Sequence, residues 1–132
     1  MVLYCMTKDE KAYKALIMAD LNIVCHYTDS KNKSEKLQAA YHMQQAIEKT
    51  IKLKAMIKGL NLWGHDINKL LSACMKANID IKIPPLLRKN AMLYTKWEAS
   101  CRYAPATIVN KNSIWAAYRV TLAWLNSGDT EK

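Results

Sequence analysis

The chain has 132 residues, of which 51% are hydrophobic and 23% are charged, and it contains only three glycines and three prolines. A chain of this length folds as one domain with a proper core, and its few turn-forming residues argue against a sheet of many strands. The formal net charge of +9 predicts attraction to phosphate-bearing partners, whether nucleic acid, nucleotide or an anionic membrane. The charge does not choose among these partners, and a lysine-rich surface that only keeps the protein soluble explains it equally well.

The cysteines and the apolar segments exclude several other classes of protein. The four cysteines are widely spaced, form no C-x-x-C pair and follow no secretory signal. This pattern indicates neither a disulfide framework nor a zinc site, and we expect no metal and no cofactor. No apolar run is long enough to span a bilayer, so we expect a cytoplasmic protein that does not bind membranes.

The first helix is predicted over residues 7–27, with Thr7 at the cap position and acidic residues in the first turn. Its buried stripe is expected to consist of the apolar residues at helical spacing, which are Ala12, Leu16, Ala19, Ile23 and Tyr27. Residues 28–34 are polar and lack periodicity, which indicates a loop.

The second helix is predicted over residues 34–57, and Gly59 suits the position that follows a helix end. Its buried stripe steps by three and four through Met43, Ala46, Ile47, Thr50, Leu53, Ile57 and Leu60. A second, polar stripe with the same spacing contains His42, Gln45, Lys49 and Lys52. Glu48 precedes Lys52 by four residues, the favourable order for an ion pair on a helix.

The second half of the chain predicts three more helices. A short one starts near Asp66, residues 79–85 form an extended loop, and Pro84 and Pro85 open a long helix that stops before Pro105. Asn112 or Ser113 is expected to cap the last helix. The chain is therefore predicted to be all-α: an up-and-down bundle of four long helices plus one short helix, forming one domain over residues 1–132 with its core in residues 7–126.

Three motifs lie on these elements in a characteristic order. A pattern H-x-x-Q-x-x-E-K-x-x-K on the second helix contains His42, Gln45, Glu48, Lys49 and Lys52. The stretch "GHDINKLL" opens the short helix with Gly64, His65, Asp66, Leu70 and Leu71. The stretch "CRYAPA" ends the long helix with Arg102 and Tyr103, followed by Ala104 and Pro105. In these motifs the chain is similar to the HEPN domain family, small helical domains of prokaryotes that also occur in some eukaryotic proteins.

The resemblance implies a choice between ribonuclease and binding protein. HEPN ribonucleases carry R-x4-6-H, in which the arginine binds the scissile phosphate and the histidine transfers a proton or orients the 2′-hydroxyl. Arg102 matches this arginine, but Thr107 stands where a histidine is expected, and no histidine follows His65. Cleavage of RNA needs a group that exchanges a proton near neutral pH, so the resemblance favours a chain that is not an active nuclease. Enzyme activity stays open, because His42 or His65 could supply the missing group if the fold brings it close to Arg102.

The leading hypothesis is a non-catalytic HEPN-like protein that binds nucleotide or RNA and forms a homodimer. As the resemblance implies, it would be the partner of a minimal nucleotidyltransferase in a toxin–antitoxin or related defence module. Its phosphate groove would lie between the second and fourth helices, lined by His42, Gln45, Lys49, Lys52, Arg102 and Tyr103. Supporting or capping roles would belong to Glu48, His65 and Asp66.

Two alternatives stay open: a degenerate or conditional ribonuclease toxin, and a purely structural helical subunit. The candidate site residues also have structural explanations. His42 can order a pair of helices, His65 can join a cap network, and Arg102 can satisfy the carbonyl groups at a helix end.

Overall fold

The computed structural model describes residues 5–103 and 109–128, with the backbone alone for residues 100–103. This part of the chain contains six α-helices and no strand. The helices are α1 (Lys8–Tyr27), α2 (Lys33–Ile57), α3 (Ile67–Lys76), α4 (Pro85–Lys89), α5 (Ala91–Tyr103) and α6 (Lys111–Leu125). The all-α prediction is confirmed.

Side-chain caps fix where most of these helices begin. Thr7 caps α1 and Asp66 caps α3, where it accepts a hydrogen bond from the backbone of Lys69, both as the sequence predicts. At α1 the structure adds a reciprocal capping box between Thr7 and Glu10. The prediction for the last helix was wrong by two to three residues. Asn110 caps α6, because its extended backbone lets its side chain accept a hydrogen bond from the backbone N–H of Asn112.

The predicted long fourth helix is divided at Asn90, so that Pro85 opens only the short α4. Asn90 has φ −105° and ψ 19°, which is outside helical geometry, and its side-chain amide donates to the carbonyl of Leu86 at 3.0 Å. An asparagine side chain that bonds the local backbone in this way competes with regular helix geometry. The periodicity could not show this break, because the apolar spacing continues across it.

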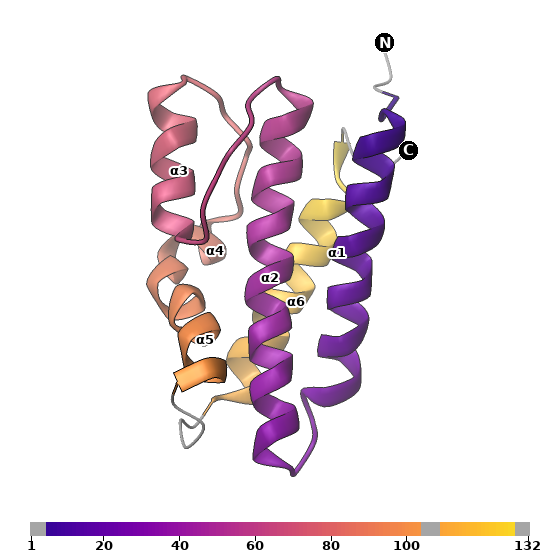
Figure 1. The fold of residues 1–132 in the computed structure, drawn as a ribbon, viewed down its shortest axis with the longest axis vertical. Coiled ribbons are helices and arrows are strands. Elements are labelled where there is room, and N and C mark those ends of the chain that lie inside the picture. The colour runs from indigo at the N-terminus through magenta and orange to yellow at the C-terminus, as the bar shows by residue number, and fades with distance from the viewer. Residues whose placement is uncertain (1–4, 104–108, 129–132) are drawn as a thin grey trace.

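The helices α1, α2, α5 and α6 form the four-helix bundle, and α2 lies in the middle of it (Figure 1). The remaining helices, α3 and α4, belong to the connection between α2 and α5. The segment 58–66 leaves the end of α2 and runs back beside it to the start of α3 (Figure 1). As a result this connecting segment lies close to the middle of α2.

The buried face of α1 differs from the predicted one. The core contains Ile17, Leu21 and Val24, each at most 1% exposed, whereas Leu16 of the predicted stripe is 55% exposed. The alanines of that stripe, Ala12 and Ala19, are not buried either. The helix carries two apolar stripes, and helical spacing alone does not tell which of them meets the rest of the bundle.

The predicted buried stripe of α2 is confirmed from Met43 to Leu53, while Ile57 and Leu60 are partly buried. The helix contacts α1, α3, α5 and α6. Because it is surrounded in this way, polar residues on other sides of α2 are buried too, namely Gln44, Glu48 and Lys54. Burying a charged or polar group is costly unless it has a partner, so these side chains are expected to form hydrogen bonds or ion pairs.

Candidate functional site

A buried carboxylate on α1 holds two basic side chains of the α2 polar stripe. Asp20 accepts a hydrogen bond from His42 Nδ1 at 2.8 Å and another from Lys49 Nζ at 2.7 Å, one through each oxygen. The two basic residues are about two helical turns apart, so they share a face of α2 and reach Asp20 from either side. This face of α2 therefore packs against α1 through charged groups.

A second buried carboxylate, Glu48, organises the next part of the same face. It accepts a hydrogen bond from His65 Nδ1 at 2.8 Å and lies 3.6 Å from Lys52 Nζ. The amide of Gln44, itself fully buried, lies 3.5 Å from the same Glu48 oxygen that binds His65. The predicted pairing of Glu48 with Lys52 is confirmed, and Glu48 also ties the segment 58–66 to α2.

These six residues form one unit, which we call the α2 cluster: Asp20, His42, Glu48, Lys49, Lys52 and His65. Its acids lie underneath and its bases lie nearer the solvent. The side chains of Asp20 and Glu48 are 9% and 3% exposed, whereas those of Lys49, His42, Lys52 and His65 are 24%, 22%, 17% and 70% exposed. A ligand that approaches from solvent therefore meets basic groups first.

The charges of the α2 cluster balance in a way that depends on its histidines. Its two carboxylates cancel its two lysines, so the cluster is neutral when both imidazoles are neutral, and each protonated imidazole adds one positive charge. Since an ionised carboxylate can only accept, Nδ1 of each histidine is the donor. The geometry thus leaves Nε2 of both rings as the atom that can gain a proton or contact a ligand.

Tyr13 of α1 connects the two halves of the α2 cluster electrostatically. Partial burial raises the pKa of the Tyr13 phenol, and the negative charges of Glu48 and Asp20 raise it further. Both carboxylates thus bear on the pKa of one aromatic side chain. Tyr13 therefore stays a neutral phenol, able to donate a hydrogen bond, beside the two acids.

The structure brings most of the predicted site residues together, but in a different setting. His42, Lys49, Lys52, Glu48 and His65 all belong to the α2 cluster. Gln45, another member of the predicted polar stripe, donates its side-chain amide to the side-chain Oε1 of Gln44 at 2.8 Å, while Asp66 only caps α3. The side chains of Arg102 and Tyr103 lie outside the described residues, as does Thr107.

The predicted groove faced the helix that bears Arg102, whereas His42 and Lys49 find their partner on α1. Asp20, which the sequence motifs do not include, is the residue responsible for this difference. A signal for it existed, because Asp20 has the spacing of the buried stripe formed by Ile17, Leu21 and Val24. An acid on a core-facing stripe indicates a paired buried charge.

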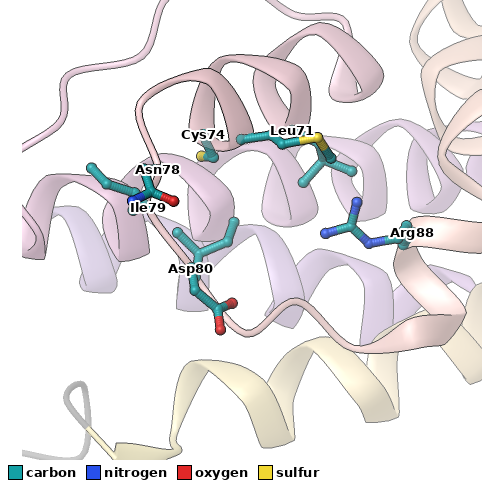
Figure 2. Close-up of a pocket in the computed structure, with 8 residues that line it drawn as sticks. Leu71, Cys74, Asn78, Ile79, Asp80 and Arg88 are labelled. Carbon is teal, nitrogen blue, oxygen red and sulfur yellow. The ribbon is translucent and has the colours of Figure 1, made fainter.

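Some cavities lie apart from the α2 cluster. One of about 210 Å³ adjoins α3 and is lined mainly by apolar side chains, with Arg88 reaching in from α4 and Asp80 on another side (Figure 2). Burial raises the pKa of the Cys74 thiol in its wall, against the opposing effect of Arg88. Across the described ranges, no group of residues could hold a metal ion, and no helix is both long and apolar enough to cross a membrane.

Comparisons with known proteins agree with this architecture. The HEPN domain profile matches residues 10–120, which include all six members of the α2 cluster. The crystal structure of TT1696 from Thermus thermophilus superposes with a TM-score of 0.65 over 90% of this chain and 94% of that one, at 19% sequence identity. No curated protein sequence matches the chain.

The fold and the profile match define a small helical bundle protein whose charged centre lies on its second helix. The chain belongs to the HEPN domain family. The likeness to TT1696 supports the fold alone, because the two sequences are too different for a function to be transferred.

Proposed function

We propose that this HEPN domain protein binds the phosphate groups of a nucleotide or RNA at the α2 cluster and does not cleave its ligand. The observation that carries the proposal is the layered arrangement of the cluster, in which Lys49, Lys52, His42 and His65 lie above two buried carboxylates. The acids hold the basic side chains in place before a ligand arrives. Less side-chain entropy is then lost when a phosphate binds.

The surface charge supports an anionic ligand. In the described part of the chain, three acidic residues are buried, namely Glu10, Asp20 and Glu48, but only one lysine, Lys54. The net charge of +9 is therefore carried mostly by exposed lysines and arginines. Such a surface raises the local concentration of polyanions around the molecule.

The proposal of a binding protein without nuclease activity rests on the sequence at the end of α5. Arg102 has no histidine at the spacing of the R-x4-6-H motif. One observation favours the alternative of a degenerate ribonuclease: Asp20 orients the imidazole of His42 as an acid orients a general base. The test of function must therefore include RNA integrity as well as affinity.

The test compares wild type with Lys49→Gln and with Arg102→Ala. Affinity for a short single-stranded RNA, measured by fluorescence anisotropy over a salt series, should fall in Lys49→Gln, and its salt dependence should become weaker. A fall in Arg102→Ala as well would extend the site to the end of α5, as the family resemblance implies. Lys76→Gln on α3 removes the same charge at an exposed position away from the cluster and is the matched control. Unchanged affinity in Lys49→Gln would refute the site, and RNA cut by wild type but not by His42→Ala would refute the absence of chemistry.

The proposal includes a protein partner, a minimal nucleotidyltransferase acting with this chain in a toxin–antitoxin or related defence module. The support is membership of the HEPN family together with the missing nuclease histidine. A domain that lacks a catalytic residue can act as the non-catalytic partner of an enzyme. We expect the neighbouring gene to encode a small nucleotidyltransferase that co-purifies with this chain. A neighbour of another kind, with no such complex, would favour the purely structural subunit.

We also propose a homodimer in which the outer face of α1 contacts a second copy. Its small apolar residues Ala12, Ala15 and Ala19 are not buried and lie around Leu16, which is 55% exposed. Small side chains let two helices approach closely, and pairing would remove this stripe from water. Light scattering at tens of micromolar, an order-of-magnitude concentration for a stable interface, should show a dimer that Leu16→Lys converts to monomer. A wild-type monomer would contradict it.

A further inference from the structure

A cavity of about 330 Å³ opens next to the α2 cluster. It lies where α1, α2 and the connecting segment 58–66 meet, and Figure 1 shows that segment running back beside α2. Its walls are Tyr13, Lys52, Met56, Asn61, Leu62 and Trp63. The volume falls at the lower end of the range typical of small-molecule sites, roughly 300 to 1,000 Å³.

The chemistry of the walls suits a flat aromatic ring. Trp63 is 88% exposed, so most of its indole is available to a partner. The ring of Tyr13 and the thioether of Met56 supply further soft, apolar surface, and such groups stack well against a planar base. Asn61 adds a side-chain amide, which can donate to and accept from the edge of a base.

The cavity is joined to the phosphate-binding groups through two of its residues. Lys52 lines the cavity and also lies 3.6 Å from Glu48 in the α2 cluster. Tyr13 lines the cavity as well, and Glu48 and Asp20 both raise the pKa of its phenol. A ligand with a ring in the cavity would therefore carry its anionic group toward Lys52 and Lys49.

We propose that the cavity between α1 and the segment 58–66 is a nucleobase pocket, in which Trp63 stacks on the base while the attached phosphate meets Lys52. The inference rests on the proposed binding of nucleotide or RNA phosphate at the α2 cluster and specifies how the base is held. Trp63 stacks, Asn61 contacts the base edge, and the segment that carries both is anchored through the bond between His65 and Glu48.

The spacing of the basic residues along α2 distinguishes two ligands that could carry the base, a mononucleotide and an RNA strand. Lys49 is about 4.5 Å from Lys52 along the helix axis, whereas His42 is about 15 Å away, at 1.5 Å per residue. A mononucleotide seated in the cavity reaches only the near end of the α2 cluster. An RNA strand, whose phosphates repeat, reaches its far end too. His42→Ala should therefore weaken the binding of a short RNA more than that of a mononucleotide if RNA is the natural ligand.

The direct test uses the tryptophan itself. Adenosine monophosphate, guanosine monophosphate and a 5′-phosphorylated tetranucleotide should each quench the emission of Trp63, and inorganic pyrophosphate should not. Trp63→Leu keeps an apolar side chain but has no ring, so its affinity for the nucleotides, measured by calorimetry, should fall roughly 5- to 150-fold. The affinity of Trp63→Phe should lie between those of wild type and Trp63→Leu. The exposed position of Trp63 means that neither variant disturbs the core.

A matched control is Trp115→Phe. Trp115 does not line the cavity, and its indole N–H donates a hydrogen bond of 2.8 Å to Asp29. This variant should keep the full quenching response. Equal nucleotide affinity in wild type and Trp63→Leu, or no quenching of wild type by any base-bearing ligand, overturns the pocket. The proposed phosphate function fails separately, if pyrophosphate binding is insensitive to Lys49→Gln. In that case, adenosine, which has a base but no phosphate, would still support the pocket if it quenches the wild type and not Trp63→Leu.

Discussion

Asp20 on α1 and Lys49 on α2 form an ion pair of 2.7 Å between two adjacent helices, with the acid almost completely buried. This pair, rather than an apolar contact, fixes the position of the lysine that we assign to phosphate binding. A buried pair contributes little net stability compared with apolar groups of the same size, but losing one partner is costly.

Asp20→Asn should therefore lower the free energy of unfolding by about 1–3 kcal/mol, since it leaves Lys49 and His42 without their anion. Chemical denaturation in urea measures the loss. The double variant Asp20→Leu with Lys49→Met removes both charges, and it should lose less than the sum of the corresponding single variants. Strictly additive losses would contradict a direct interaction between the two side chains.

Glu48→Gln should release the segment 58–66 from α2. A neutral amide oxygen accepts a weaker hydrogen bond from Nδ1 of His65 than a carboxylate does. We expect faster trypsin cleavage after Lys58 and faster hydrogen exchange of the backbone near His65. Asp9→Asn, an exposed acid in the first turn of α1, is the control. Equal cleavage rates in wild type and Glu48→Gln would show that the bond does not restrain the segment.

The raised pKa of Tyr13 predicts a loss of stability at alkaline pH. In the unfolded chain tyrosine ionises near pH 10, before Tyr13 does in the folded protein, so the free energy of unfolding falls as pH rises above about 10. The stabilising contribution is complete below that pH and disappears as pH passes the raised pKa of the folded state. Tyr13→Phe should flatten this alkaline decline.

The cause of the Tyr13 shift can be checked in the same experiment. Burial is its largest cause, and the charge of Glu48 adds to it, so Glu48→Gln should give an alkaline decline that lies between those of wild type and Tyr13→Phe. A decline identical to wild type in Tyr13→Phe would mean that other tyrosines, such as the buried Tyr94 whose pKa is also raised by burial, dominate it.

The cysteines should differ in reactivity toward iodoacetamide. Cys25 is exposed on α1, while Cys74 is 3% exposed and its pKa is raised by burial, which reduces the fraction of reactive thiolate. In the native protein Cys25 should be modified quickly and Cys74 only after denaturation. Mass spectrometry of tryptic peptides measures both rates, and comparable native rates would contradict the burial of Cys74.

Local signals in the sequence predicted several features of the fold correctly. Thr7 and Asp66 cap helices, and Gly59 follows α2 with φ 86°, because capping chemistry and a positive φ depend mainly on neighbouring residues. Features that depend on distant residues were predicted less well. The choice between the two apolar stripes of α1 requires knowledge of what α1 packs against.

The candidate site shows the same division. The polar stripe of α2 was visible in the spacing of His42, Lys49 and Lys52, and these residues do belong to one cluster. Their partner Asp20 is 22 residues from His42 and 29 from Lys49, so only the tertiary structure reveals that the lysine is paired. The nucleobase pocket could not be predicted, because its walls come from two helices and a segment without periodicity.

The central position of α2 also determines the order in which the chain is expected to fold. Its largest interface is with α1, the helix next to it in sequence, and a contact between neighbours costs little loop-closure entropy. We therefore expect the α1–α2 hairpin to form the folding nucleus on which α5 and α6 dock later. Substitutions at Ile17 or Ile47 should slow folding, whereas substitutions at Leu125 of α6 should mainly accelerate unfolding.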